Sequence, residues 1–596
     1  MESFMHALDA INGVLWHDFV LYVVLGVGVL FTLWSGFSQY RALTHGVSVI
    51  RGKYDRKDDP GAINHFQALS TALSGTVGLG NIAGVSVAVS LGGPGAIFWM
   101  WVVGAVGMAL KLTEVTQSMM FRDVSDPENP QGGPMWVCKN GLAKISPALA
   151  PLGWTLGAIF CVTVIISTFT GGNMFQAWNV AKITATYVPS MSSLVVGVIL
   201  TVLTAAVIIG GIKRIGSVTG RLVPFMCGLY FIAAVVILAM NAGAIPAVLK
   251  TIVLCGLPPA LGGESGNPEG AFLGGTFGYA FLWGMKRALF SNEAGQGSAP
   301  IAHSAAKTDE PVREGVVAGL EPFIDTLVVC TVTAMVVMVS GAWNRPAAAM
   351  FATTPSMVQA HGDDGQPIPG AWVPSTSELP AKPGAEAAIS NVWRDNDGLF
   401  VLVTGDVDPN TGRDLHRVMG EVHHGEGDGD ALLIKWEPYE SETAPVVAGP
   451  EIHLSLPGSS LTGYAFDRAI PGMGMWIVTL ASWLFALSTI ISWSYYGEQA
   501  TVFLAGNKWV FPYKFVYCAA VLVACIPGFI KTDAELDAFT ALGTGVMLWA
   551  NIPIMLIFGP IAMRAYKDYI RRLDAGEMKG HGYPEITDVA GGRDVR

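Results

Sequence analysis

The chain has 596 residues, of which 51% are apolar and only 14% are charged, and its formal net charge is −11. Soluble domains typically carry about 25% charged residues, and the mean hydropathy of this chain is +0.46. These values exclude an ordinary soluble enzyme, a nucleic-acid-binding protein and a disordered chain. They predict an all-α polytopic membrane protein whose first partner is the lipid bilayer.

Eleven apolar segments are long enough to cross a bilayer, which requires about 17–25 residues in a helix. They lie near residues 19–38, 66–91, 95–119, 153–177, 193–211, 220–241, 272–303, 315–341, 472–501, 511–529 and 538–563. Lys and Arg collect in the odd-numbered loops and in the tail after the last segment. The positive-inside rule therefore predicts a multi-pass protein of the plasma (inner) membrane, with its N-terminus outside and its C-terminus in the cytoplasm.

One loop, at residues 343–467, is long, polar and rich in Pro, Gly and acidic residues. Its runs 398–405 and 431–437 read as strands bounded by turn residues. The segment follows the eighth span, so we expect a small β-rich extracytoplasmic insert. The acidic spacing that begins at Asp406 is similar to the start of a calcium loop, but a hairpin turn between two strands is the favoured interpretation.

Two of the spans are interrupted by Gly and polar residues. The second contains SGTVGLGN at residues 74–81, and the seventh contains SNEAGQG at residues 291–297. A spanning helix satisfies its own backbone groups, so an interruption is expected only where it lines a cavity or a binding site. The alternative is that these glycines only let helices pack closely, but in 74–81 the small and polar residues occupy every face.

The positions of the two interruptions predict an inverted-repeat transporter. Spans 2–6 and 7–11 form two sets of five, each opening with its broken helix, and five spans reverse the orientation of the second set. The predicted organisation is an N-terminal segment with an extra helix (1–65), a first repeat (66–241), spans 7 and 8 (272–342), the insert (343–467), spans 9–11 (468–563) and a cytoplasmic tail (564–596).

Several motifs carry a resemblance to a known family. They read ALSGTVGLGNIAGV, GGPGAIFWMW, KRALFSNEAGQGSAPIAHSAAKTDEPV, FIDTLVVCT and STIISWSYYGE. The chain resembles the alanine/glycine:cation (sodium) symporter family of the amino acid–polyamine–cation superfamily, which is similar in fold to the neurotransmitter:sodium symporters. The resemblance implies a sodium-coupled transporter rather than an enzyme. The long insert departs from the short loop expected of that family.

A zwitterionic amino acid needs N–H donors for its carboxylate and oxygen acceptors for its ammonium group. The half-helix after the first break offers free N–H groups and a positive dipole end at residues 79–81, and carbonyls at 290–293 would face the ammonium group. With the resemblance, the candidate substrate contacts are Thr76, Leu79, Gly80, Asn81, Phe169, Gln176, Asn292, Glu293 and Trp493. The two aromatic residues among them would equally suit a lipid-facing or core position.

Sodium is a hard ion that prefers oxygen ligands, as the hard divalent ions do. The unwound carbonyls of Ser74 and Val77 are candidates, and the resemblance adds the hydroxyl groups of Ser488 and Thr489. The alternative for these hydroxyls is a bond back to a carbonyl of their own helix. A second sodium ion would use Thr76 and Asn81.

Ionisable residues inside spans are candidates for function by default. Lys286 and Arg287 precede the second break and are candidates for a gate, through pairing with Glu293 or Asp325. Lys111 and Glu114 are spaced to form a pair on the third span.

The leading hypothesis is a secondary active transporter that carries alanine, glycine or another small neutral amino acid with sodium by alternating access, without an organic cofactor. Proton coupling is the first alternative. A channel with the breaks as its filter, or a receptor with the insert as its sensor, are the others. The sequence leaves the choice of amino acid, the stoichiometry and the oligomeric state open.

Overall fold

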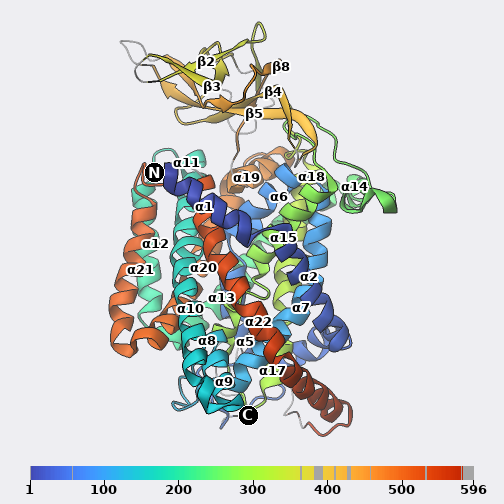
Figure 1. Cartoon of the computed structure of the whole chain (residues 1–596), viewed down its shortest axis with the longest axis vertical. Coiled ribbons are helices and arrows are strands. Elements are labelled where there is room, and N and C mark those ends of the chain that lie inside the picture. The colour runs from blue at the N-terminus through green and yellow to red at the C-terminus, as the bar shows by residue number, and fades with distance from the viewer. Residues whose placement is uncertain are drawn as a thin grey trace.

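The computed structural model describes residues 2–56, 58–362, 365–381, 393–408, 411–425, 431–456, 458–530, 533–578, 580 and 589. The chain forms a bundle of helices with a small β-rich unit at one end (Figure 1). Helix α1 (Glu2–Leu15) lies at the end of the bundle that carries the β-rich unit, and the C-terminus lies at the opposite end (Figure 1).

Each of the eleven predicted ranges contains a helix or a succession of helices. They are α2 (Asp18–Trp34), α5 (His65–Thr76) with α6 (Val85–Gly92), α7 (Gly95–Phe121), α10 (Ala150–Phe169) with α11 (Phe175–Tyr187), α12 (Ser193–Ile208), α13 (Gly211–Met240), α15 (Phe277–Asn292) with α16 (Ala299–His303), α17 (Pro311–Ala318) with α18 (Thr331–Val339), α20 (Thr479–Ala505), α21 (Val510–Ala524) and α22 (Asp533–Asp574). Among the described residues, seven helices are long and apolar enough to cross a membrane, or eight if the bent pair α5–α6 is one span. The chain is therefore a multi-pass helical membrane protein, and the count of eleven spans and the inverted repeat stay predictions.

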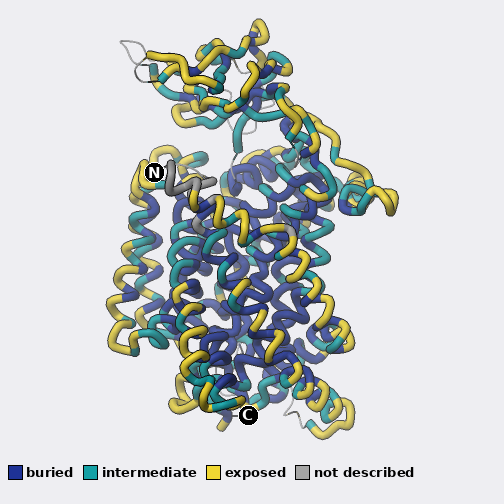
Figure 2. Tube along the Cα trace, viewed as in Figure 1, coloured by how far each residue is buried: buried dark blue, intermediate teal, exposed yellow. Residues whose placement is uncertain are grey.

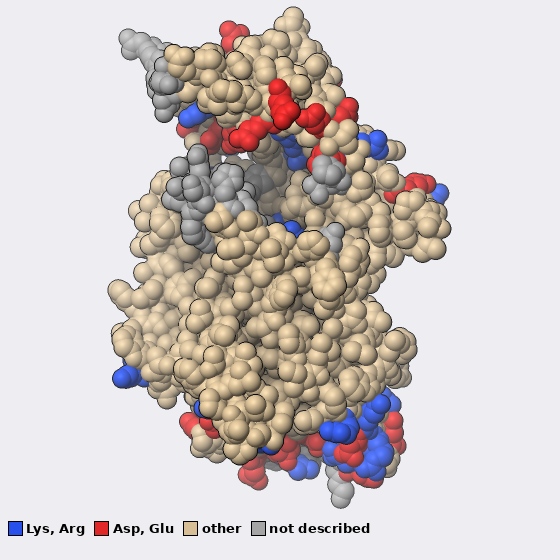
Figure 3. Space-filling view, in the orientation of Figure 1, with Lys and Arg blue, Asp and Glu red and all other residues tan. Residues whose placement is uncertain are grey.

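The surface of the bundle has the polarity that a bilayer requires. Figure 3 shows a broad belt around the middle of one face without charged side chains, while Lys, Arg, Asp and Glu gather at its two ends. The centre of the bundle is buried, and exposed residues lie on its outer helices (Figure 2). Large apolar side chains such as Phe225, Ile232 and Phe515 are exposed on the outside, which suits contact with lipid rather than with water.

The insert contains two antiparallel sheets, with strand orders β1-β8-β4-β5-β6 and β2-β3-β7. The strands are β1 (Ala349–Met350), β2 (Met357–His361), β3 (Pro367–Pro374), β4 (Gly398–Asp408), β5 (Arg413–His424), β6 (Leu432–Trp436), β7 (Tyr439–Glu440) and β8 (Val446–Leu454). Leu399, Val401 and Val403 alternate along β4 and are fully buried in the insert's own apolar core. The strands predicted at 398–405 and 431–437 are confirmed as β4 and β6, and β4 pairs with β5 as the hairpin expected at Asp406.

Among the described residues, three further helices of more than ten residues were not predicted from the sequence, and α1, before the first predicted span, is one of them. Helix α14 (Ile245–Gly256) precedes the seventh predicted span, and α19 (Gly458–Ala469) follows the last strand of the insert. The Thr462 hydroxyl of α19 donates to the carbonyl of Ile82 at 2.8 Å, directly beyond the first break. The insert range 343–467 therefore holds a β-rich part and, at its end, a helix that packs on the bundle. The short helices are α3 (Ser38–Arg41), α4 (Val47–Ile50), α8 (Pro134–Trp136) and α9 (Leu142–Ile145).

Candidate substrate and sodium site

The first break separates α5 from α6 by a bend of 52°. Helix α5 ends at Thr76, Val77 leaves the helical conformation with ψ 82°, and helical turns resume at Gly80. The side-chain oxygen of Asn81 accepts the N–H of Gly78 at 2.9 Å, so a residue of the second half-helix holds the unwound turn. The unwound turn is therefore held by a side chain in addition to the backbone.

The second break separates α15 from α16. Helix α15 ends at Asn292, and Glu293 takes a left-handed conformation with φ 53°, which is costly for a residue with a Cβ. Gly295 and Gly297 follow with φ of 81° and 82°. The Asn292 side chain accepts the N–H of Ala294 at 3.0 Å, which again fixes an unwound turn with an amide side chain.

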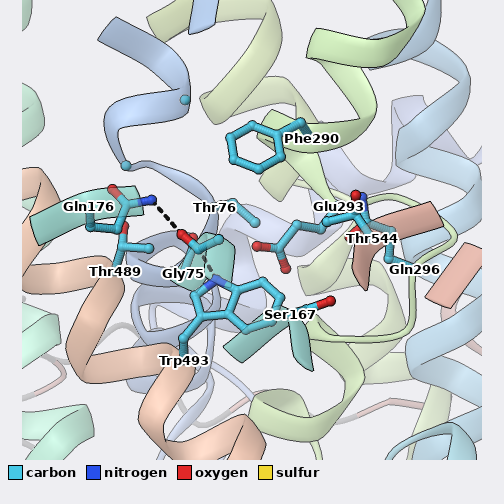
Figure 4. A pocket seen from close by; sticks show the side chains of 13 residues that line it. Gly75, Thr76, Ser167, Gln176, Phe290, Glu293, Gln296, Thr489, Trp493 and Thr544 are labelled. Atoms are coloured by element: carbon cyan, nitrogen blue, oxygen red, sulfur yellow. Dashed lines mark hydrogen bonds between the residues drawn. The ribbon is translucent and has the colours of Figure 1, made fainter. Parts of the chain in front are cut away.

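A cavity lies between the two breaks (Figure 4). The Glu293 carboxylate points toward its middle, with the Phe290 ring on one side and the Trp493 indole on another (Figure 4). Its lining residues are Gly75, Thr76, Gly78, Gly80, Ser167, Gly171, Gln176, Phe290, Glu293, Gln296, Thr489, Trp493 and Thr544. The two interrupted spans, which are more than 200 residues apart in the chain, thus face one shared space.

Polar side chains around the cavity are held by defined bonds. The Leu79 N–H donates to Gln176 Oε1 at 3.1 Å, and Gln176 Nε2 donates to the Gly171 carbonyl at 2.9 Å. The Trp493 indole N–H donates to the Gly75 carbonyl at 3.3 Å. Glu293 accepts a short hydrogen bond from the Ser298 hydroxyl. These bonds orient a buried carboxylate and an amide toward the cavity.

The four predicted sodium ligands are close together beside the cavity. The Thr489 hydroxyl donates to the Ser74 carbonyl at 3.0 Å, and the Ser74 hydroxyl donates to the Ser488 carbonyl at 2.6 Å. The Ser488 hydroxyl bonds mainly back to Phe485 of its own helix at 2.8 Å, which is the alternative that the sequence left open. Val77 lies at the end of α5, one turn from Ser74.

Asp325 forms a second buried polar cluster with the first break. Its Oδ1 accepts from Asn81 Nδ2 at 2.5 Å, and its Oδ2 accepts from the hydroxyls of Ser291 and Thr326 at 2.8 and 2.7 Å. Asn292 Nδ2 donates to Thr326 Oγ1 at 3.0 Å. The predicted contacts Asn81 and Asn292 therefore lie in this cluster, next to the cavity but not on its lining.

Other predicted residues are placed elsewhere. The Phe169 ring packs on Tyr513 and Tyr517, with centroids 6.0 and 5.7 Å away, and is not among the residues that line the cavity. The Arg287 guanidinium lies 5.2 Å from the centre of the Trp283 ring. The pairing of Lys286 or Arg287 with Glu293 or Asp325 stays a prediction. The predicted pair of Lys111 and Glu114 is confirmed, at 3.6 Å.

Four cavity residues were not assigned as side-chain contacts from the sequence. Ser167 and Thr544 are hydroxyl residues on long apolar helices that carry other hydroxyl residues, such as Thr168 and Thr540, and nothing in the pattern distinguishes them. Gln296 could have been predicted, because it lies inside the SNEAGQG motif and a polar side chain within a span requires polar partners. Phe290 entered the sequence analysis only through its carbonyl.

The apolar helices and the cavity between two broken helices define a multi-pass membrane protein with an internal cavity. The model of the sodium:alanine symporter family matches residues 1–368 and 442–582, so the chain belongs to this family. It is a transporter and not an enzyme. Residues 369–441, in the insert, fall outside the match.

Curated relatives carry names of the same kind. The sodium/alanine symporter AgcS of Methanococcus maripaludis is 34% identical over 88% of each chain. The putative sodium/proton-dependent alanine carrier protein YrbD of Bacillus subtilis is 28% identical over 95% of this chain and 93% of its own. The probable sodium/glutamine symporter GlnT of Bacillus subtilis is 33% identical over 60% of this chain and 70% of its own.

Proposed function

We propose that this protein couples the inward transport of a small neutral amino acid, alanine or glycine, to sodium by alternating access. The observation that carries the proposal is the cavity between the two breaks, where unwound backbone and a carboxylate face one space. Discontinuous helices at the middle of a bundle are the usual place for substrate and coupling ions in secondary transporters. The proposed architecture is eleven spans with a five-plus-five inverted repeat.

The substrate would lie across the two breaks. The start of the half-helix after Gly78 favours an anion, because it is the positive end of a helix dipole. The N–H groups of Gly78 and Leu79 bond Asn81 and Gln176 in this structure, and the substrate carboxylate would replace these side-chain acceptors. Glu293 on the opposite side supplies a negative charge for the ammonium group. Gln176 holds the Leu79 N–H and thereby positions the carboxylate side of the site. Trp493 closes the cavity and limits it to small side chains.

Sodium would bind where the Ser74 carbonyl meets Thr489, with Val77 and Ser488 adjacent. The ion would contact the Ser74 carbonyl oxygen at the point where this oxygen now accepts the hydrogen of the Thr489 hydroxyl. The Thr489 hydroxyl bonds a carbonyl of another helix and not one of its own. Movement of one helix relative to the other would therefore bring these two sodium ligands together or separate them. This coupling of an ion site to a helix–helix contact supports sodium as the co-transported ion, and so does the similarity to a relative named as a sodium/alanine symporter.

The orientation follows from charge. The insert and α1 lie at one end of the bundle and the C-terminus at the other (Figure 1). We propose that the protein lies in the plasma membrane, with the insert and the N-terminus outside and the C-terminus in the cytoplasm. The reason is that Lys and Arg are enriched in the loops at the end of the bundle opposite the insert.

Proton coupling is the second candidate, and the Asp325 cluster favours it. This carboxylate is buried and accepts hydrogen bonds from three neutral side chains, those of Asn81, Ser291 and Thr326. A buried carboxylate with only neutral donors suits either a bound cation or a bound proton.

The test is uptake of radiolabelled alanine into vesicles containing the purified protein, with and without an inward sodium gradient. Thr489→Val removes the crossing hydroxyl and keeps the shape. Thr501→Val is the matched control, because Thr501 lies on the same helix and its hydroxyl bonds back to Gly497 at 2.7 Å. Sodium-driven accumulation that is lost only in Thr489→Val supports the proposal. Accumulation driven by a proton gradient alone would show that protons, and not sodium, are the coupling ion. If the folded protein takes up no alanine, the proposed substrate is wrong.

A further inference from the structure

A network of buried ionisable side chains lies at the end of the bundle opposite the insert. Its centre is Glu314 of α17, whose two carboxylate oxygens face two histidines. His303 Nδ1 of α16 is 2.5 Å from Glu314 Oε1, and His65 Nδ1 of α5 makes a short contact with Glu314 Oε2. All three side chains are buried. One carboxylate therefore joins the half-helix before the first break to the half-helix after the second.

His303 has a carboxylate on both sides. Its second nitrogen, Nε2, is 2.6 Å from Glu321 Oε1. A neutral imidazole carries one N–H and one acceptor nitrogen, and an ionised carboxylate only accepts. Two such contacts are satisfied together only if the imidazole is doubly protonated or if one carboxyl group holds the proton. A neutral histidine between two ionised carboxylates therefore has one proton too few for this geometry.

The neighbouring charges favour retention of that proton. Lys111 of α7 is 3.4 Å from Glu321 and 3.6 Å from Glu114, and Asn551 of α22 donates to Glu114 at 3.0 Å. With both imidazoles neutral, the carboxylates of Glu114, Glu314 and Glu321 would outnumber the two cations that interact with them, Lys111 and Arg122. A protonated His303 reduces this excess of buried negative charge, which is costly in a low dielectric.

The remaining titratable groups around the network come from other elements. Asp55 Oδ1 is 3.7 Å from His65 Nε2, and Arg313 of α17 is 3.8 Å from Asp59, which precedes α5. Burial raises the pKa of Asp55, while His65 and Arg313 lower it. From α20, Tyr496 interacts electrostatically with Glu321 and with Glu293 of the cavity. Arg122 is a further cation at the network, because it interacts electrostatically with Glu314.

The network lies where the two half-helices must separate if the cavity is to open at this end. Ile63 and Ala306 pair as a β-bridge beside it, so the segments that enter α5 and leave α16 are already in contact. Arg122 donates to the carbonyls of Ser304 and Ala306 at 2.7 and 2.8 Å and to Pro60 at 3.2 Å. Opening would break the shared Glu314 contacts and admit water.

We propose that His303, together with Glu314 and Glu321, is a proton-binding site that holds the cytoplasmic half-helix α16 to Glu314 and, through the contact of Glu314 with His65, to the half-helix α5. In the closed form the imidazolium bonds both carboxylates. On opening, Glu314 and Glu321 separate from it, and the imidazolium returns its proton to cytoplasmic water. Closing takes a proton back. Cytoplasmic pH therefore sets how readily this end opens, independently of which ion drives uptake.

This inference rests on the proposed alternating-access function, so the first measurement does not use transport. The full-length protein labelled with ¹⁵N-histidine, in lipid nanodiscs, would be titrated by NMR. We expect an imidazolium signal that persists above about pH 7.5, past the usual histidine range near 6.5. It should be absent from His303→Gln and present in His45→Gln. A neutral His303 at about pH 7 would overturn the proposal.

His45→Gln is a matched control because His45 is a buried histidine that bonds Tyr569 at 2.7 Å, outside the network. Burial and the nearby Arg313 lower the pKa of His45 to about 4, so it is neutral throughout the titration. Its replacement therefore changes packing at the same end of the bundle without removing a proton site.

The second measurement is alanine uptake into right-side-out membrane vesicles at fixed external pH, with the lumenal pH varied between about 6 and 9. We expect the wild-type initial rate to rise about tenfold as the lumenal pH increases over this range, because the closed form is the one that holds the proton. This increase should be nearly lost in His303→Gln. Equal pH dependence in both proteins contradicts the proposal. Absence of uptake in the wild type contradicts the transport function instead, while the NMR result stands. Monodisperse gel filtration of each variant excludes misfolding as the cause.

Discussion

The Thr489 hydroxyl donates to the Ser74 carbonyl at 3.0 Å, although the two residues are 415 positions apart. Gly78 makes this approach feasible, because a Cβ at Gly78 would lie 2.5 Å from Thr489 Oγ1. Contacts under about 3 Å force one group to move. The absence of a side chain at Gly78 is thus part of the proposed sodium site, and not only a packing convenience.

We expect Gly78→Ala to abolish sodium-driven uptake while leaving the protein foldable. The added methyl group would displace Thr489 from Ser74 and crowd Gln176 Oε1, which lies 3.3 Å from the same position. Gly228→Ala is the control, because nothing lies within 4 Å of a Cβ there. The double variant Gly78→Ala/Thr489→Ala should recover thermal stability but not sodium dependence, and a simple sum of the two single effects would contradict the coupling.

We expect Glu293→Gln to raise the KM for alanine by about 10- to 100-fold, because a hydrogen bond to a charged group contributes about 1.5–3 kcal/mol. Glutamine keeps an oxygen that accepts from Ser298, so the left-handed turn at Glu293 is retained. The measurement is competition by unlabelled alanine over a wide concentration range. A change in maximal rate at constant KM would instead place Glu293 in the conformational step.

The sequence predicted the two breaks because their residues contradict a spanning helix. Asn81 in one span and Glu293 in another are costly in lipid unless they have polar partners or line a site, and the glycines beside Asn81 weaken a helix. The residues that meet between distant helices were harder to assign. Thr489 was found only through the resemblance, because a hydroxyl on an apolar helix bonds equally well to its own backbone.

Other features could not be predicted because they depend on tertiary packing. Phe169 was expected at the cavity but packs on Tyr513 and Tyr517, and aromatic residues give no sequence signal for which neighbour they face. Helix α19 was hidden in a polar segment because its burial is against the bundle and not against its own insert. The sharing of Glu314 by two histidines joins residues 249 and 11 positions away, which no local pattern reveals.

We expect Arg122→Lys to destabilise the folded protein by about 1–3 kcal/mol. The guanidinium group donates to Pro60, Ser304, Ala306 and Thr308 at once, and an ammonium group cannot reach carbonyls in that planar arrangement. The apparent melting temperature in detergent measures the loss. Arg571→Lys is the control, since Arg571 is exposed and pairs with Asp568 at the same end. Equal stability of the two variants would show that the bonds of Arg122 to the segments around Pro60 and Ala306 do not stabilise the folded protein.

The insert provides the last prediction, because its two ends are adjacent. The Ala348 N–H donates to the Ile452 carbonyl at 2.8 Å, and Arg345 bonds the Leu454 carbonyl. The insert has its own apolar core, separate from that of the bundle. Residues 349–451 can therefore be replaced by a Gly-Gly turn without pulling the ends of the bundle apart.

We expect this deletion to retain sodium-driven alanine uptake, with rate and KM within about twofold of the wild type, since rigid scaffolds tolerate replacement of surface insertions. Uptake and the melting temperature of the full chain and the deletion would be compared side by side. A protein that folds but no longer transports would show that the insert takes part in the cycle. That outcome would direct attention to Arg417, which donates from β5 to the Ala271 carbonyl at 2.6 Å and links the insert to the segment before α15. Arg417→Gln in the intact chain should then reproduce the loss, because it removes this link without shortening the chain.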